Sequence, residues 1–95
     1  MKKNLTKKEY RIYYIKDGVR IKGVHSKISG DARYIRGDVS GIEGDVSGIL
    51  GDVSFIRGNV SGIKGDVSRI EGNLNTCEIT EEDRENGIDI EDLIK

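Results

Sequence analysis

Residues 37–71 read GDVSGIE, GDVSGIL, GDVSFIR, GNVSGIK and GDVSRIE, which are five consecutive units of one seven-residue pattern. Aligned on their first glycine, eight such units run from Gly23 to Glu78 without an insertion. A period held over this length indicates a repeat architecture, in which each unit packs mainly against its neighbours. The repeat G-[DN]-V-S-x-I-x therefore decides the fold of this chain.

The valine and isoleucine places alternate at spacings of three and four, which is also the spacing of a coiled-coil heptad. The helical interpretation fails on propensity, because every unit carries at least one glycine and each glycine costs about 1 kcal/mol relative to alanine in a helix. A strand of the form Ile-x-Gly-Asp-Val instead places Ile, Gly and Val on one face. Ser and the residue after it then form a corner. We expect the glycine to point inward, because a narrow core lacks room for three large side chains.

The repeat predicts a mainly β fold: a small single-stranded parallel β-helix (solenoid) over residues 21–77, preceded by a basic N-terminal arm over residues 1–9. Residues 10–24 predict a β-hairpin that caps the repeat, because alternating apolar residues flank Asp17-Gly18, a pair typical of tight hairpin turns. The aromatic residues Tyr13, Tyr34 and Phe55 are spaced by 21 positions. This spacing favours three units in each turn of the solenoid, although two units per turn would stack Glu43, Arg57 and Glu71 with alternating charge.

Residues 78–95 predict an acidic helical cap at the other end. Thr80 is suited to cap a short helix whose first turn is acidic, and Gly87 is suited to end it. Asp89 can cap a second short segment. We expect four apolar side chains of this region to cover the open end of the core: Ile79, Ile88, Leu93 and Ile94.

Three quoted units, Gly37-Asp-Val-Ser-Gly, Gly44-Asp-Val-Ser-Gly and Gly58-Asn-Val-Ser-Gly, resemble the pentapeptide-repeat family, whose units read roughly A-[DN]-L-S-x. The chain departs from that family by two extra residues, Ile-x, in every unit. It also resembles bactofilin-type β-helices in its repeated Gly-Asp-Val. The resemblance covers about residues 21–77 and implies a quadrilateral or triangular β-helix.

The formal net charge of −1 conceals a strong polarity along the chain. Residues 1–36 carry eleven Lys and Arg against three Asp and Glu, residues 37–75 carry three against six, and residues 76–95 carry two against eight. Opposite charges at the two ends indicate separate surfaces for separate partners or head-to-tail contact between copies. A short repeat also buries only a small core, so we expect an oligomer, most simply a homodimer.

The chain contains no apolar run of about 20 residues, so no membrane segment is expected. The basic start is not followed by the apolar stretch of a signal peptide. A single cysteine fits a reducing compartment, and the expected location is cytoplasmic. We expect no cofactor, since one cysteine and one histidine cannot form a zinc site.

Cys77 occupies the isoleucine place of the last unit and is expected to be a small buried side chain. His25, at the valine place of the first unit, is expected to be structural. The repeated acids Asp38, Asp45, Asp52 and Asp66 are expected to form hydrogen bonds at turns. Calcium binding, as in acidic β-rolls, and imitation of nucleic-acid phosphates, with Glu43 and Glu71 added, remain alternatives.

No phosphate-binding loop, pair of catalytic carboxylates or activated nucleophile is evident in the sequence, so we expect a binding protein rather than an enzyme. The leading hypothesis is a phage protein of the anti-CRISPR type that binds and inhibits a bacterial defence effector. The segment Cys77–Ile94 looks like a C-terminal pattern of small phage-borne heptad-repeat proteins, C-x-I-T-x-x-x-R-x-x-G-I-x-I-x-x-L-I. The alternatives are a self-assembling structural solenoid and a nucleic-acid binder that uses the basic N-terminal region. The candidate partner-binding residues are Asp38, Glu43, Asp45, Asp52, Asp66, Glu71, Tyr34, Phe55, Lys7, Lys8, Arg11, Arg36 and Arg57.

Overall fold

The computed structural model describes residues 1–5 and 12–94 and is mainly β, with parallel sheets and a short C-terminal helix. Its strands are β1 Ile12–Lys16, β2 Val19–Lys22, β3 Ile28–Ser29, β4 Ile35–Asp38, β5 Ile42–Asp45, β6 Ile49–Asp52, β7 Ile56–Asn59, β8 Ile63–Asp66, β9 Gly72–Asn73 and β10 Ile88–Asp89. The helical segments are η1 Leu74–Thr76, α1 Glu81–Asn86 and η2 Ile90–Leu93. Each strand of the regular repeat therefore begins at the isoleucine, as the sequence predicts, and ends at Asp or Asn.

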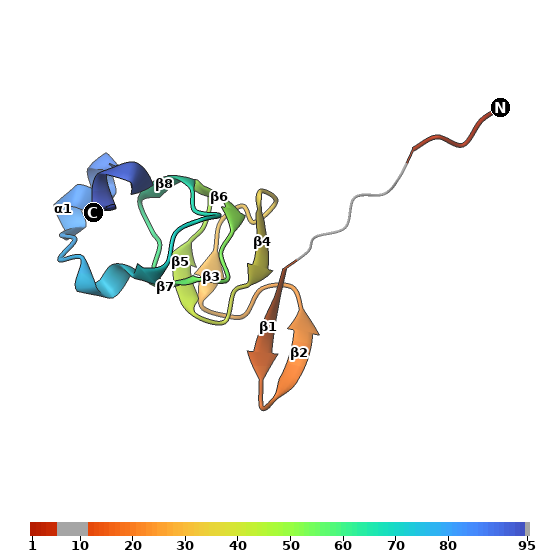
Figure 1. Ribbon diagram of the computed structural model, residues 1–95, viewed down its shortest axis with the longest axis horizontal. Coiled ribbons are helices and arrows are strands. Elements are labelled where there is room, and N and C mark those ends of the chain that lie inside the picture. The colour runs from red at the N-terminus through yellow and green to blue at the C-terminus, as the bar shows by residue number, and fades with distance from the viewer. Residues whose placement is uncertain (6–11, 95) are drawn as a thin grey trace.

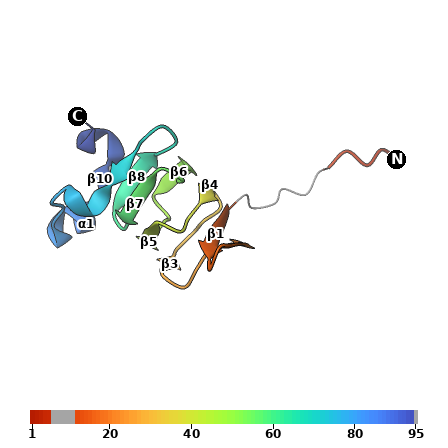
Figure 2. The ribbon, with the colours of Figure 1, turned by 60° about the horizontal axis from the view of Figure 1, so that its bottom comes forward.

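The strands of the repeat alternate between two sheets (Figure 1). One sheet has the order β10-β8-β6-β4-β1-β2, and the other has the order β3-β5-β7-β9. Neighbouring repeat strands in a sheet are two units apart and parallel, as in the row β4, β6 and β8, and β10 extends this row from outside the repeat (Figure 2). The expectation of three units per turn is therefore wrong. The spacing of 21 between the aromatic residues reflects no stacking, because Tyr34 and Phe55 precede strands of different sheets.

Each strand is also displaced by two residues along its neighbour. Ile35 lies beside Gly51 and Arg36 beside Asp52, so the nearest residue in the next strand is 16 positions later (51 − 35) rather than 14. The same offset relates β5 to β7, where Glu43 lies beside Asn59. The variable residue of one strand consequently lies beside the Asp or Asn of the next strand, and not beside the next variable residue.

The core consists of the valine and isoleucine places of both sheets. Val39, Val46, Val53, Val60 and Val67 are completely buried, and the isoleucines that open β4 to β8 are at most 4% exposed. The β-branched shape of these residues suits a half-buried pleated strand. Ile12, Leu74 and Ile90 complete this cluster at its ends.

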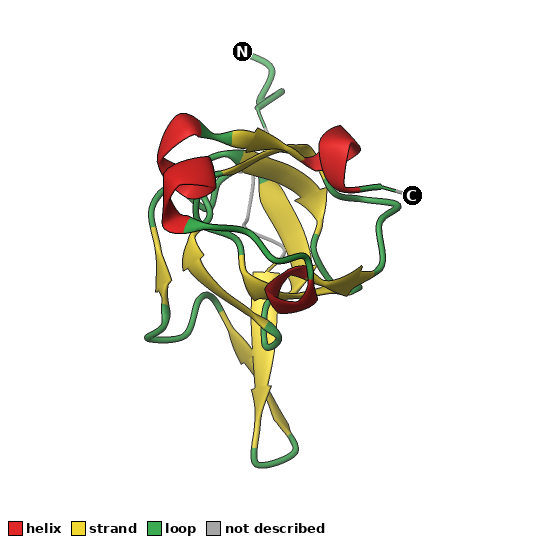
Figure 3. Cartoon of the chain, turned by 90° about the vertical axis from the view of Figure 1, so that its left-hand side faces the viewer, coloured by secondary structure: helices red, strands yellow, loops and turns green. Residues whose placement is uncertain are grey.

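The two ends of the core are closed differently. At the N-terminal end the predicted hairpin is present, with β1 antiparallel to β2 and parallel to β4, and the hairpin projects from the body of the molecule (Figure 3). At the C-terminal end, β10 pairs with β8, and η2 brings Ile90 to 2% exposure. Ile79, Ile88 and Leu93 pack against the core as expected, whereas Ile94 remains 49% exposed. The buried apolar residue that the sequence interpretation missed is Ile90.

The C-terminal helix forms as its sequence predicts. The Thr80 hydroxyl accepts from the N–H of Asp83, and a carboxylate oxygen of Asp83 accepts from the N–H of Thr80. This reciprocal pair is a capping box. Gly87 ends the helix with φ +82°, and Asp89 caps η2 through the N–H of Glu91.

Truncation of Ile49 tests the core assignment. Ile49→Ala removes a side chain that is 1% exposed, so we expect a loss of about 2–5 kcal/mol in the free energy of unfolding. Leu50→Ala is the matched control, because Leu50 is adjacent in the chain but 45% exposed, and we expect a change within about 0.5 kcal/mol. Urea unfolding followed by circular dichroism measures both. Equal losses would contradict the assignment of the two faces.

Candidate functional site

The Asp or Asn of each regular unit folds the turn that follows it. Oδ1 of Asp38 accepts from the N–H of Ser40 at 2.9 Å, and the same bond joins Asp45 to Ser47 and Asp52 to Ser54. Asn59 and Asn73 form the equivalent bond with Ser61 and Asn75. An amide oxygen accepts this bond as a carboxylate does, which explains why Asp and Asn interchange at this place.

The serine of each unit connects neighbouring strands. Oγ of Ser54 accepts from the N–H of Asp38 at 3.0 Å, and Oγ of Ser68 accepts from the N–H of Asp52 at 3.1 Å. We call this series the serine ladder. Its members are Ser40 on Ile15, Ser47 on Asp31, Ser54 on Asp38, Ser61 on Asp45 and Ser68 on Asp52, with Asn75 on Asn59.

The serine hydroxyl also donates to its own aspartate. Oγ of Ser47 lies 2.6 Å from Oδ1 of Asp45, and the same pair occurs at Ser68 and Asp66. The hydroxyl thus donates to a carboxylate and accepts from a main-chain N–H of the neighbouring strand, and a donor to a charged acceptor forms a strong hydrogen bond. In the regular units, the N–H that the serine hydroxyl accepts from belongs to the last residue of a strand, as in Asp38, Asp45 and Asp52.

The glycine of each unit is needed for a different reason from the expected one. Gly37, Gly44 and Gly51 have φ between +93° and +97°, a conformation that favours glycine. A Cβ at Gly51 would not enter the core, because it would collide with Oδ1 of Asp66, at the end of β8, and with Oγ of Ser68, in the turn that follows. The expectation that these glycines point inward to save room in the core is therefore wrong. They allow the backbone to approach the serine ladder.

Substitution of two glycines separates this effect from loss of flexibility. We expect Gly51→Ala to lower the free energy of unfolding by at least about 2 kcal/mol, because the alanine meets both an unfavourable φ and the collision with Ser68. Gly23→Ala is the control, since Gly23 has a similar φ of +102° but a Cβ there would meet no atom within 4 Å. Denaturant unfolding of both variants checks this. A Gly23 variant as unstable as the Gly51 variant would refute the collision as the explanation.

The ladder carboxylates bind protons less readily than ordinary ones. The hydroxyl and then the N–H of the following serine lower the pKa of Asp45, Asp52 and Asp66 below the ordinary 3.8. Arg36 adds a smaller effect on the pKa of Asp52 and Asp66. Asp31, which lacks a serine two residues later, is held by Arg33, whose side chain lowers the pKa of this carboxyl to about 2.

Acid should therefore weaken the fold over a defined range. A carboxyl with a folded-state pKa below its unfolded value stabilises the fold above the unfolded value and loses that contribution as the pH falls through the folded value. We expect stability to decline from about pH 4 downward, with Asp31 contributing until about pH 2. Unfolding by urea across this range measures the decline.

A triple variant assigns the pH effect to the ladder. Asp45→Asn, Asp52→Asn and Asp66→Asn together keep an oxygen acceptor, as Asn59 does naturally, but remove the titrating group. We expect a flatter dependence of stability on pH below about pH 4. Glu43→Gln serves as the control because its side chain lies outside the ladder, and it should leave the slope unchanged. Parallel curves for wild type and triple variant would exclude these carboxylates as the cause.

The remaining candidate residues face outward but do not gather at one place. Arg36 lies on the outer face of the six-stranded sheet beside Asp52, and Leu50 lies beside Asp66 on the same face. Glu43 and Arg57 lie on the four-stranded sheet, beside Asn59 and Asn73. Acids and cations therefore alternate on these faces, and neither face is uniformly acidic. Tyr34 and Phe55 are 62% and 61% exposed at turns that lead into different sheets. Glu71 precedes β9 and is exposed.

Three of the candidate cations, Lys7, Lys8 and Arg11, lie outside the described residues. Of the described cations near the N-terminal end, Lys16, Arg20 and Lys22 belong to the hairpin and are exposed. The Arg20 guanidinium lies 3.7 Å from the centre of the Tyr13 ring. The sequence predicted the hairpin, but it did not indicate that the cations of the hairpin form a separate surface.

His25 is held by its neighbours, as expected of a structural residue. Its Nδ1 accepts from the N–H of Lys27 at 3.2 Å, so the proton lies on Nε2, which donates to the carbonyl of Val39 at 2.9 Å. Its ring also meets Tyr14 edge to face at 5.7 Å. These contacts join the hairpin to the first strands of the repeat.

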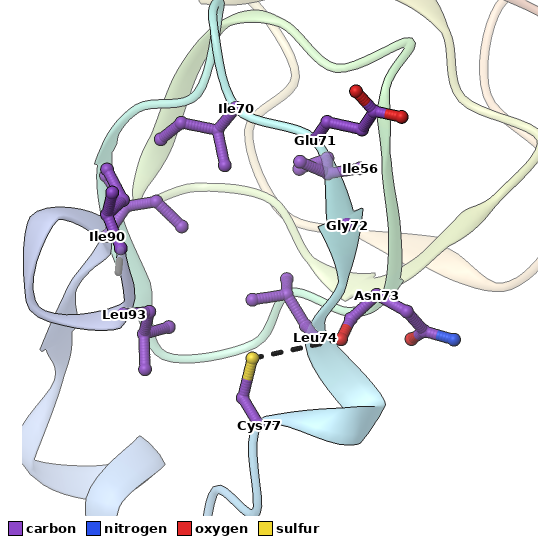
Figure 4. Close-up of a pocket in the computed structure, with 10 residues that line it drawn as sticks. Ile56, Ile70, Glu71, Gly72, Asn73, Leu74, Cys77, Ile90 and Leu93 are labelled. Atoms are coloured by element: carbon purple, nitrogen blue, oxygen red, sulfur yellow. Dashed lines mark hydrogen bonds between the residues drawn. The ribbon is translucent and has the colours of Figure 1, made fainter.

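Cys77 is exposed, which contradicts the expectation of a buried side chain. The last unit buries Leu74 at the valine place and then turns into η1, so the chain leaves the repeat before Cys77 reaches the isoleucine place. Its thiol points toward the carbonyl of Asn73 at 3.8 Å (Figure 4). It borders a small apolar pocket of about 60 Å³ at the end of the core, lined by Ile56, Ile70, Leu74, Ile90, Leu93 and Ile94 among others.

Arg84 is a second residue that the sequence interpretation missed. Nη1 of Arg84 donates to the carbonyls of Asn59 and Ser61, at 2.8 and 2.7 Å. These bonds fasten α1 to the turn after β7, where Gly62 leaves space for the Arg84 backbone. The only arginine of an otherwise acidic helix was the available signal for this contact.

Among residues 1–5 and 12–94, no three His, Cys, Asp or Glu side chains surround a point at which a metal ion could bind. In the same residues, no helix has the length and apolar character that a membrane crossing needs. Comparison of the chain with protein-family models, with curated proteins and with solved structures finds no match.

Proposed function

We propose that the chain is a two-sided β-solenoid that acts as a non-catalytic binding scaffold. The observation that carries this proposal is that different places of each unit have different structural roles. The Gly, Asp or Asn, Val, Ser and Ile places of the regular units are used by the core and the serine ladder. The last place differs in each regular unit, and its side chains lie outside the core cluster: Glu43, Leu50, Arg57, Lys64 and Glu71. The regular units therefore differ mainly at a place that a partner could contact, and the repeat holds those side chains at fixed spacing.

We further propose that the partner is a bacterial defence effector, which the protein inhibits by binding in the manner of an anti-CRISPR protein. The support is the separation of positive and negative charge along the chain and the likeness of Cys77–Ile94 to small phage-borne heptad-repeat proteins. The outer surface carries cations, acids and isolated exposed aromatic side chains. Such a surface suits binding to one large partner, because Tyr and Arg are enriched among the residues that contribute most of the binding energy at protein interfaces.

A tagged pull-down from bacterial lysate, with and without nuclease, tests this function. We expect a nuclease-resistant protein or ribonucleoprotein in the eluate, and inhibition of that effector in a reconstituted assay. Replacing the outward Tyr34, Phe55 and Arg57 with alanine should weaken capture at least about tenfold and leave the unfolding midpoint nearly unchanged. Full activity of every effector tested in the presence of the protein would refute the inhibitor proposal.

A self-assembling scaffold is the second candidate, favoured by the placement of charge. The hairpin cations Lys16, Arg20 and Lys22 lie at one end of the molecule, and α1, with Glu81, Glu82 and Asp83, lies at the other (Figure 1). Head-to-tail contact between copies would pair these ends. Analytical ultracentrifugation would then show assemblies that grow with concentration and dissociate as salt screens the charges.

A further inference from the structure

The outer strand of the hairpin has an open edge. β2 is the last strand in the order of the six-stranded sheet, and among the described residues it pairs on one side only, with β1. An unpaired strand edge carries a row of N–H and C=O groups that can accept another strand. The projection of the hairpin from the body leaves this edge accessible (Figure 3).

The bonds of β1 establish which groups of β2 face outward. The N–H of Ile15 donates to Oγ of Ser40, and the carbonyl of Tyr13 accepts from the N–H of Val39, so these two residues direct their main-chain groups toward β4. Their partners across the hairpin are Arg20 and Lys22. In an antiparallel pair such residues form the non-hydrogen-bonded positions. The main-chain groups of Arg20 and Lys22 therefore point away from β1, toward the open edge.

The same two residues give this edge its charge. Arg20 and Lys22 are exposed and share one face, where the Arg20 guanidinium rests on the Tyr13 ring at 3.7 Å. Lys16 adds a third cation, and the apolar side chains of Val19 and Ile15 are 60% and 45% exposed. An incoming strand would place its residues opposite Arg20 and Lys22, where opposite charges stabilise a pair and like charges destabilise it.

We propose that the open edge of β2 binds an extended acidic segment of a partner protein, which joins the six-stranded sheet as a further strand. This inference rests on the proposed function, because it adds to the repeat a second surface of contact with the same partner and names the chemistry of the segment that binds there. The β2 strand of a second copy fits poorly, since pairing two such edges would oppose cations. Nucleic acid is also disfavoured, because the Arg20 guanidinium already stacks on one face of the Tyr13 ring and competes there with a base.

Amide NMR spectra of the full chain, titrated with a short capped peptide of alternating Glu and Val, test the proposal. We expect the largest shifts at the amides of Arg20 and Lys22, and binding at least about tenfold tighter than that of the matching Lys and Val peptide. Equal affinity for the two peptides, shifts centred elsewhere, or tighter binding of oligouridylate at these amides would overturn it.

Three variants separate charge from main-chain pairing. Arg20→Glu with Lys22→Glu should reverse the preference between the two peptides, whereas Lys2→Glu with Lys3→Glu, in the arm, should not. Lys22→Thr removes one charge and keeps the outward N–H, while Lys22→Pro removes both without breaking a bond to β1. We expect the proline variant to bind at least about fivefold more weakly than the threonine variant. Equal binding by these two variants would overturn the strand-addition mode.

The pull-down separates this inference from the proposed function. Equal capture of a defence effector by the wild type and by the charge-reversed hairpin would leave the proposed function standing and would overturn the β2 edge as part of the binding surface. Selective binding of the acidic peptide, with no effector captured by the wild type, would support the edge and contradict the proposed target.

Discussion

The hydrogen bond from a main-chain N–H to the serine of the next strand in the same sheet is the contact on which the rest of the fold depends. It places Ser54 against Asp38 and Ser68 against Asp52, and it requires a glycine where the two strands approach. The aspartate in turn orients the serine and accepts a hydrogen bond from its hydroxyl. The Gly, Asp and Ser places of each unit are therefore fixed by one local network of contacts. The Val place between Asp and Ser is fixed by burial, so four of the seven places are restricted. The isoleucine adds the second row of the core.

Much of this arrangement followed from the sequence, because the repeat restricts each place to a few residues. Strand position, the hairpin at Asp17-Gly18, the capping box at Thr80 and the alternation of buried and exposed places could be read from residue types alone. The number of units per turn could not, because Val and Ile periodicity is the same for two or three faces. The spacing of 21 residues between Tyr34 and Phe55 led to the wrong prediction of three units per turn. These side chains are exposed, so their spacing need not match the spacing of stacked strands.

The other errors arose where a residue's role depends on a distant strand. The position of Gly51 suggested inward packing, but its constraint comes from Ser68, in the turn after the neighbouring strand β8. Cys77 matched a buried place in the repeat, but η1 diverts the chain first. The same limitation applies to the candidate site. Outward orientation could be predicted for Arg36 and Arg57, whereas the open edge of β2 depends on the pairing of β1 with β4.

The alternation of strands between two sheets makes the parity of the repeat count significant. β10 pairs with β8 in the six-stranded sheet. Whether the number of units before β8 is even or odd therefore decides on which sheet the acidic helix α1 and the hydrogen bonds of Arg84 are placed. Gain or loss of fourteen residues would lengthen or shorten the scaffold and keep both ends in phase. Gain or loss of seven would transfer the C-terminal closure to the opposite sheet and rotate it about the long axis relative to the hairpin. A chain of this kind can therefore change its length only by two units at a time if its two ends are to keep the same orientation relative to each other.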